Sequence, residues 1–349
     1  MGLSDEQSKW LSQSLRAPRE ELSIRLIAGD ASPRRYYRVA HQAVTPESLQ
    51  QSVIFAVSPP SESNEAFAQV RALLAQHEIR VPDLIEADLS RGFFVLEDLG
   101  NNLLLEQLDE ESVDQLYKQA LNLLVRMQTP GLGLEDLPIY DKYLLQNELD
   151  LFLEWFVDKL LDIAVSQEVR RLFRDLCDEL IASGLEQPRV FVHRDFHSRN
   201  LMCLSDGDLA TIDFQDAVVG PITYDVVSLL KDCYVEWPRA SQLAWLREFW
   251  FVTPGSLSAR DISFDRVTRW YDLMGLQRHI KVLGIFARLS IRDSKHHYLS
   301  DLPRVIRYIR ETLLLYRSAP DIQLFAEWFE AKIMPQVICQ PWFSDAESL

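Results

Sequence analysis

The chain has 349 residues, which is enough for two domains or for one two-lobed unit with a large core. Its 52 acidic and 36 basic residues give a formal net charge of −16, which argues against nucleic acid and anionic membrane surfaces as partners. The four cysteines form no C-x-x-C pair, so neither a disulfide framework nor a structural zinc site is indicated. The N-terminus is polar and no apolar run is long enough to span a bilayer, so we expect a cytoplasmic protein.

The first part of the chain combines short β-like segments with one helix. Strands are expected near residues 22–27, 36–39 and 53–57. The stretch SESNEAFAQVRALLAQHEI then carries capping residues followed by apolar residues at helical spacing, which predicts a helix. Two more strands are expected at residues 84–87 and 93–96.

From Asn101 onward the pattern is mostly helical. The exception lies between residues 190 and 213, where FVHRD, NLMCL and LATID predict three very short strands. Helical patterns resume near Thr223. We therefore expect an α+β protein with a small β-rich N-terminal lobe, residues 1–98, and a large helical C-terminal lobe, residues 99–349.

The residues that carry chemistry follow one short motif. The segment from His193 to Asn200 reads HRDFHSRN, which fits H-R-D-x-x-x-x-N, and Asp213 follows thirteen residues later at the end of a short strand. Asp195 can accept the proton of an attacking hydroxyl, while Asn200 and Asp213 offer hard oxygen ligands for Mg²⁺ on the phosphates of ATP. Either acid alone could be an ordinary loop residue, so the interpretation depends on the joint spacing.

This two-part pattern resembles the catalytic and metal loops of the protein-kinase superfamily. Asp213 is followed by Phe214-Gln215, and a G-P-x-x-x-D segment ends at Asp225. In these features the chain is similar to the aminoglycoside phosphotransferase and choline kinase branch, whose members phosphorylate small molecules. The resemblance implies a protein-kinase-like two-lobed fold, ATP and Mg²⁺ as cofactors, and structural roles for His193 and Asp225. Asp225 would accept hydrogen bonds from the backbone of the catalytic loop.

The nucleotide side departs from the kinase pattern. No G-x-G-x-x-G is present, and the third expected strand lacks the lysine that grips the α- and β-phosphates. The loop between the first two strands instead offers a glycine, a serine and three arginines, although it could also be a solvated basic turn. Residues 95–98 resemble the hinge whose backbone binds adenine, or they are a plain connector between lobes. The expected nucleotide contacts are Gly29, Ser32, Arg34, Arg35, Arg38, Glu97 and Leu99.

Four longer segments point to one family within this branch. GDASPRRYYRV, HRDFHSRNLM, IDFQDAVVGPITYD and GLQRHIKVLGIFARL are similar to the bacterial anomeric kinases of N-acetylmuramate and N-acetylglucosamine, over nearly the whole chain. That family implies ATP-dependent phosphorylation of the anomeric hydroxyl to a sugar α-1-phosphate, in peptidoglycan recycling. The product would pass to a sugar-1-phosphate uridylyltransferase. We expect a monomer.

The large lobe offers side chains that fit such a sugar. Trp270 presents a flat face for pyranose C–H groups, although most such aromatics are core residues. Arg278 and Lys281 are i, i+3 neighbours that could attract a lactyl carboxylate. Two alternatives stay open: an aminoglycoside or amino-alcohol (choline-like) kinase, and a nucleotide-binding pseudokinase-type regulator, which the missing lysine suggests. The expected substrate contacts are His197, Arg199, Trp270, Arg278 and Lys281.

Overall fold

A computed structural model describes residues 2–28, 34–41, 52–59, 62–129, 132–255, 257 and 262–343. The chain divides into two compact units, which are described separately. The N-unit comprises Met1–Gln107 and Arg199–Asp216, and the C-unit comprises Leu108–Ser198 and Ala217–Leu349. The expected boundary between lobes after residue 98 stays a prediction.

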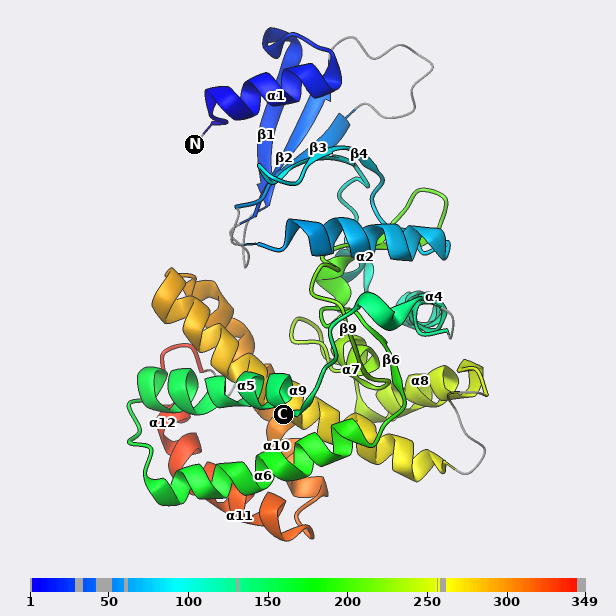
Figure 1. Ribbon diagram of the computed structural model, residues 1–349. Helices are drawn as coiled ribbons and strands as arrows, with labels where there is room; N and C mark the ends of the chain where they lie inside the picture. Colours follow the sequence, from blue (N-terminus) through cyan, green and yellow to red (C-terminus); the bar gives the residue numbers. More distant parts are fainter. Residues whose placement is uncertain are drawn as a thin grey trace. The chain divides into compact units, whose positions relative to one another are not determined.

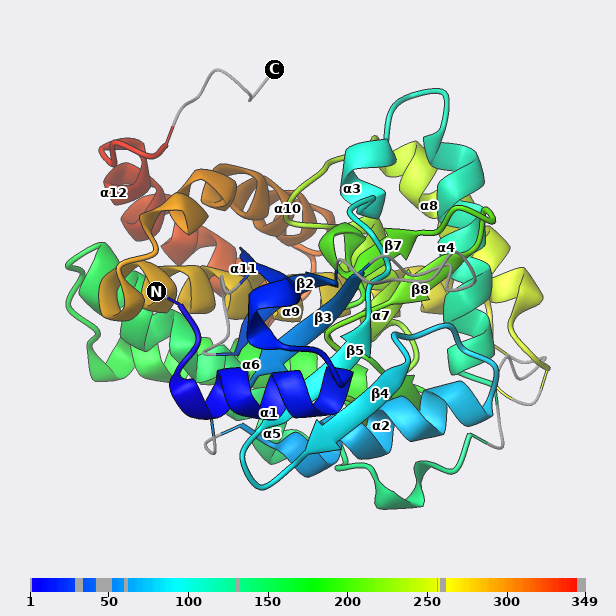
Figure 2. The same ribbon diagram turned by 90° about the horizontal axis from the view of Figure 1, so that it is seen from above.

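The N-unit contains a five-stranded antiparallel sheet in the order β1-β2-β3-β5-β4. In Figure 2 the labels β2, β3, β5 and β4 follow one another across it. All five strands lie where the sequence predicts them. The elements are α1 (Asp5–Leu15), β1 (Leu22–Ala28), β2 (Arg35–His41), β3 (Ser52–Val57), α2 (Asn64–Gln76), β4 (Leu84–Asp88) and β5 (Phe93–Glu97), with a short 3₁₀ turn, η1 (Arg19–Glu21).

Two helices pack on opposite faces of this sheet. The Trp10 ring of α1 lies 5.8 Å from Phe55 and 5.5 Å from Phe93, measured between ring centroids. The Phe67 ring of α2 lies 5.1 Å from Phe94. Because Phe93 and Phe94 are successive residues of β5, their side chains point to opposite faces. Both faces of the sheet are therefore covered, by α1 and α2 (Figure 1).

A hairpin from later in the chain completes the N-unit. Its strands are β7 (Leu201–Cys203) and β8 (Leu209–Thr211), preceded by the 3₁₀ turn η4 (Ser198–Asn200). The Cys203 N–H donates to the Asn102 carbonyl (2.8 Å), just before α3 (Leu104–Gln107). The Thr211 N–H donates to the Arg80 carbonyl (3.0 Å). The hairpin thereby brings the Asn200 and Asp213 ends of its strands into the N-unit.

The C-unit is built around the 30-residue helix α9 (Phe264–Asp293). Every residue from Trp270 to Gly284 is buried, because α9 is packed by helices on all sides (Figure 1). The strands β6 (Arg189–Val192) and β9 (Val218–Pro221) form an antiparallel ribbon. The remaining helices are α4 (Val113–Met127), η2 (Leu134–Asp136), α5 (Lys142–Leu151), the π-helix η3 (Phe152–Leu160), α6 (Gln167–Leu185), α7 (Tyr224–Leu230), α8 (Arg239–Val252), η5 (His296–Asp301), α10 (Leu302–Leu315), α11 (Pro320–Trp328), the π-helix η6 (Phe329–Ile333) and α12 (Met334–Ile338).

None of the helices in the described part of the chain is both long and apolar enough to cross a lipid bilayer.

Candidate active site

The catalytic loop, residues 193–198, leaves the end of β6 and is held by a buried carboxylate. The His193 and Arg194 N–H groups donate to the two oxygens of Asp225, at 2.6 and 3.0 Å. Arg194 has φ = 74°, a backbone conformation that costs energy in any residue other than glycine. Two hydrogen bonds to one buried carboxyl group hold the backbone in this conformation. Asp225, in the first turn of α7, therefore fixes the start of the loop.

Asp195 lies in an environment that favours its ionised form. Burial alone would raise the pKa of Asp195, but the electrostatic effects of Lys281, His197 and Arg194 outweigh burial and lower that pKa below its usual value. The Asp195 N–H donates to Nδ1 of His193 at 3.3 Å. The carboxylate is therefore charged near neutral pH and can accept a proton or a hydrogen bond.

The pKa of Asp225 is shifted in the opposite direction, upward. Burial raises the pKa of Asp225 to about 7, against the lowering effect of the two backbone N–H donors. The nearby charge of Asp195 raises the pKa further.

Glu148 of α5, which sequence reasoning missed, joins the cations around Asp195. Its Oε1 accepts from Nζ of Lys281 (2.9 Å) and from Nη2 of Arg194 (2.5 Å). Its Oε2 accepts from the Tyr140 hydroxyl and from Nε2 of Gln277 (3.4 Å). Burial would raise the pKa of Glu148, but Lys281 and Arg194 lower it on balance. Glu148 thus holds two cations in place beside the catalytic loop.

Arg278 differs from Lys281 in its partners. Its side chain is buried, with 4% of the residue exposed, and its Nη1 donates to Sγ of Cys233 at 3.4 Å. Across the ranges that the structure describes, Arg278 forms no ion pair with a carboxylate. A buried guanidinium whose one hydrogen-bond acceptor is a thiol retains the capacity to bind an anion.

The other expected substrate contacts lie in different surroundings. His197 packs its ring edge-on against Tyr234, at 5.3 Å between centroids. Trp270 is buried, and its indole N–H donates to Glu186 (2.5 Å). Arg199 belongs to the 3₁₀ turn at the start of the N-unit hairpin. Their roles toward a substrate stay predictions.

Asn200 and Asp213 are joined across the N-unit hairpin. The Ile212 N–H donates to the Asn200 carbonyl at 3.0 Å, which sets Asp213 one residue beyond this bond. Asp213 has φ = 66°, a second non-glycine residue in the left-handed region at a motif position. No group of three or more His, Cys, Asp and Glu side chains that could hold a metal was found among the described residues. One carboxylate and one amide nevertheless suit Mg²⁺, which keeps phosphate oxygens and waters as its other ligands.

Gln215, also missed by sequence reasoning, links Asp213 to Arg34. Its Nε2 donates to Oδ1 of Asp213 (3.0 Å), and its Oε1 accepts from Nη1 of Arg34 (3.3 Å). Arg34 is 2% exposed, with its guanidinium 5.1 Å from the centre of the Phe67 ring. Burial raises the pKa of Tyr36, as does the charge of Asp213, so Tyr36 adds a neutral neighbour to this group. The Gln215 side chain thus connects a buried cation, Arg34, to the candidate metal ligand Asp213.

The remaining expected nucleotide contacts are scattered. Gly29 and Ser32 lie outside the described residues. Arg35 is exposed, whereas Arg38 forms two hydrogen bonds to Asp98, at 2.5 and 2.8 Å. The side chain of Glu97 pairs with Arg80, and Leu99 is half-buried beyond the end of β5. The roles of these residues toward a nucleotide stay predictions.

Comparisons with known proteins agree with this arrangement. The family described as "Phosphotransferase enzyme family" matches residues 23–260. The N-acetylmuramate/N-acetylglucosamine kinase of Pseudomonas aeruginosa is 40% identical over 282 residues, 81% of each chain. The protein of the same name from Neisseria meningitidis is 37% identical over 317 residues, 89% of this chain and 92% of that protein.

The solved structures address the fold. Choline kinase LicA from Streptococcus pneumoniae aligns with a TM-score of 0.59 at 13% identity, over 88% of this chain and 100% of that chain. The gentamicin complex of APH(2")-IIa aligns with a TM-score of 0.61 at 12% identity, over 88% of this chain and 97% of that chain. The predicted α+β, protein-kinase-like fold is confirmed. The resemblance inferred from the motifs at Asp195, Asn200 and Asp213 is confirmed as well, and the chain belongs to the phosphotransferase enzyme family.

Proposed function

We propose that this enzyme transfers the γ-phosphoryl group of ATP to the anomeric hydroxyl of N-acetylmuramate and N-acetylglucosamine. The product would be the sugar α-1-phosphate, formed in peptidoglycan recycling. One observation carries the proposal: relatives named for these two sugars are 37–40% identical over at least 81% of the chain. The motif residues Asp195, Asn200 and Asp213 supply what phosphoryl transfer needs.

Asp195 is the proposed general base. Its lowered pKa keeps the carboxylate ionised, so it can orient the anomeric hydroxyl and accept its proton as the phosphoryl group is transferred. Lys281 and Arg194 support this state by their charge, and Glu148 keeps both of them in position. General-base assistance of this kind contributes about 10²–10⁴ in rate.

Asn200 and Asp213 are the proposed ligands of Mg²⁺. Bound there with ATP, the ion would neutralise charge on the phosphates. The hydrogen bond from Ile212 to the Asn200 carbonyl holds the two segments together before any ligand binds. Gln215 fixes one oxygen of Asp213 by a hydrogen bond of 3.0 Å, which orients the carboxylate.

Arg34 is the proposed replacement for the missing lysine of the third strand. Of the three arginines expected near the phosphates, Arg34 alone is buried and joined to Asp213 through Gln215. Arg35 is exposed, and Arg38 is engaged by Asp98. A buried guanidinium can carry the charge that a kinase lysine supplies to the phosphates.

Arg278 is the proposed contact for the lactyl carboxylate that distinguishes N-acetylmuramate. Lys281 already shares Glu148 with Arg194, whereas among the described residues the hydrogen bond of Arg278 goes to a thiol. A bidentate guanidinium–carboxylate pair suits such a group. Removing Arg278 should therefore weaken binding of N-acetylmuramate more than that of N-acetylglucosamine.

The proposal is tested by locating the transferred phosphate. ADP release would be measured with both sugars, choline and kanamycin, and the product would be examined by phosphorus NMR. We expect turnover of both sugars and phosphorus coupled to the anomeric proton, and no turnover of the methyl glycosides, whose anomeric oxygen is blocked. Turnover of a methyl glycoside, or coupling to the C6 protons, would refute phosphorylation at C1. Turnover of choline or kanamycin alone would favour the alternative kinase.

The proposal extends to the protein's location, its oligomeric state and the enzyme that uses its product. We propose that the enzyme acts as a cytoplasmic monomer and that a sugar-1-phosphate uridylyltransferase consumes its product. Light scattering would give the oligomeric state. Formation of a UDP-sugar from UTP in a coupled reaction would test the second step, and a product inert to such an enzyme would contradict it.

A further inference from the structure

The segment that joins α7 to α8, residues 231–238, supports the end of the catalytic loop. Oδ2 of Asp232 accepts from the Ser198 N–H (2.9 Å) and from the Ser198 hydroxyl (2.5 Å). Two residues on, the Tyr234 ring packs against His197. Asp232 and Ser198 are both fully buried. The joining segment therefore contacts the two residues with which the loop ends.

Carboxylates at the start of α7 and just after its end bind the two ends of the loop. Asp225 binds the first two amides of the loop, and Asp232 binds the last. Asp225 lies in the first turn of α7, which ends at Leu230, and Asp232 follows two residues after that end. The N–H of Lys231 donates to the Val227 carbonyl (2.9 Å), and Lys231 itself leaves the helical conformation, with φ = −116° and ψ = 49°. Asp195 lies between the two fixed ends.

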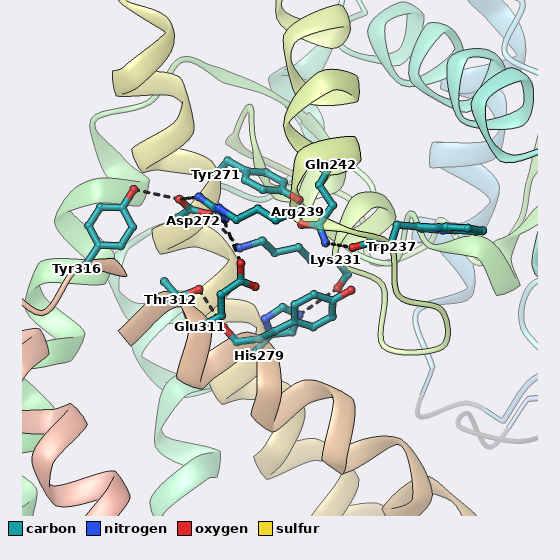
Figure 3. Close-up of polar contacts among 11 residues, drawn as sticks. Lys231, Trp237, Arg239, Gln242, Tyr271, Asp272, His279, Glu311, Thr312 and Tyr316 are labelled. Atoms are coloured by element: carbon teal, nitrogen blue, oxygen red, sulfur yellow. Dashed lines mark hydrogen bonds and ion pairs between the residues drawn. The ribbon is translucent and has the colours of Figure 1, made fainter. Parts of the chain in front are cut away.

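The Asp272 carboxylate of α9 binds Lys231, the first residue of the joining segment, and Arg239, the residue that follows it (Figure 3). Oδ1 of Asp272 accepts from Nζ of Lys231 (3.0 Å) and from Nη1 of Arg239 (2.8 Å), while its Oδ2 accepts from Nη2 of Arg239 (2.7 Å). Tyr316 donates its hydroxyl to the same oxygen at 3.0 Å. The side chains of Lys231 and Asp272 are 0% exposed. Buried ion pairs are tolerated where hydrogen bonds satisfy the charged groups, as they do at Asp272.

The backbone of the joining segment is fixed as well. Nε2 of His279 lies 3.0 Å from the Lys231 carbonyl, so the ring binds the residue next to Asp232. A side chain at Gly275 would lie 3.2 Å from Cδ of Lys231, so the absence of one leaves room for the lysine along α9. Position 232 thus has little freedom to move.

We propose that Asp232 is a positioning residue for phosphoryl transfer. It fixes the end of the catalytic loop through Ser198, and Asp272 fixes the segment that carries Asp232. Only the choice of substrate in the assay rests on the proposed function. A displacement of about 1 Å at a catalytic group can cost 10²-fold in rate, so the effect should be on turnover.

The test compares Asp232→Asn with Ser228→Ala. Asparagine keeps the shape of the side chain, but either orientation of its amide turns the N–H₂ group toward an N–H donor, because Oδ2 of Asp232 accepts from the Ser198 N–H and Oδ1 from the Tyr234 N–H (3.0 Å). We expect kcat to fall about 10–100-fold, with KM for ATP and for N-acetylglucosamine changed less than about threefold. Ser228→Ala removes a buried hydroxyl of α7 that donates to the Tyr224 carbonyl four residues earlier on the same helix, and should leave kcat unchanged. In a double variant with Ser198→Ala, the two losses should be less than additive, because both act through one hydrogen-bonded pair.

Hydrogen–deuterium exchange gives a measurement that is independent of the substrate. In Asp232→Asn, amides of residues 193–198 should exchange at least tenfold faster, while those of α6 stay unchanged. A kcat equal to that of Ser228→Ala, together with unchanged exchange in the loop, would overturn the proposal. If the wild-type enzyme used neither sugar, the proposed function would fail, and exchange in the loop would decide for or against Asp232.

Discussion

Replacing Glu148 with glutamine should destabilise the C-unit severely. The Glu148 side chain is 7% exposed and accepts hydrogen bonds from two cations, Lys281 and Arg194. Each hydrogen bond to a charged group is worth about 1.5–3 kcal/mol, and removing one member of a buried ion pair typically costs about 3–5 kcal/mol. We expect the free energy of unfolding to fall by about 3–5 kcal/mol, because glutamine removes the buried carboxylate that pairs with both cations.

The free energy of unfolding would be measured by urea denaturation at pH 7, with circular dichroism as the signal. Values for the variants can be compared directly if their m-values are equal. Glu154→Gln is the matched control, since Glu154 is 54% exposed and pairs with Lys159 at 2.6 Å on the surface of the same unit. An exposed pair of this kind contributes below about 1 kcal/mol. If the two variants lost equal stability, the pairing of Lys281 and Arg194 with Glu148 would contribute no more than an exposed ion pair, and the reasoning would be wrong.

Three further predictions concern single side chains. Asp195→Asn should keep Mg²⁺-ATP binding in calorimetry while turnover falls about 10²–10⁴-fold, and turnover near the wild-type value would remove Asp195 from the mechanism. Arg34→Ala should raise the KM for ATP in steady-state kinetics, whereas Arg35→Ala should not; equal effects would contradict the assignment of the buried arginine. Native Asp225 keeps its proton up to a pKa of about 7, whereas the unfolded chain loses it near 3.8, so this group makes the free energy of unfolding decrease as pH rises from about 4 to 7. Asp225→Asn should abolish this contribution, and an identical pH profile for the variant would refute it.

The sheet could be predicted from the sequence because each strand carries its own pattern. The strand β9 could not, because its segment is only Val218–Pro221 and contains a glycine and a proline, which argue against a strand. It forms by pairing with β6, far away in sequence. The π-helix Phe152–Leu160 was also beyond sequence reasoning, because its apolar residues follow a spacing that suits an α-helix equally well.

The motif residues could be predicted because their spacing is local, whereas the roles of Glu148 and Gln215 depend on distant contacts. Glu148 meets Arg194 46 residues away, and Gln215 meets Arg34 181 residues away. One signal was available for Glu148: it lies between the buried Leu145 and Leu149 on a helix face, where an unpaired charge would be costly.

The hairpin of residues 201–211 has a consequence for how this chain can be divided. The N-unit ends at Gln107 and is completed only by Arg199–Asp216, so the chain passes between the units three times. A fragment ending at Gln107 would lack the strand that bonds to Asn102 and the amide that bonds to Arg80. During synthesis, the N-unit could not reach its final form until residue 216 had left the ribosome. A chimera of two relatives that exchanges the N-unit therefore needs three junctions, because a single crossover would combine the sheet of one relative with the hairpin of the other, which carries Asn200 and Asp213.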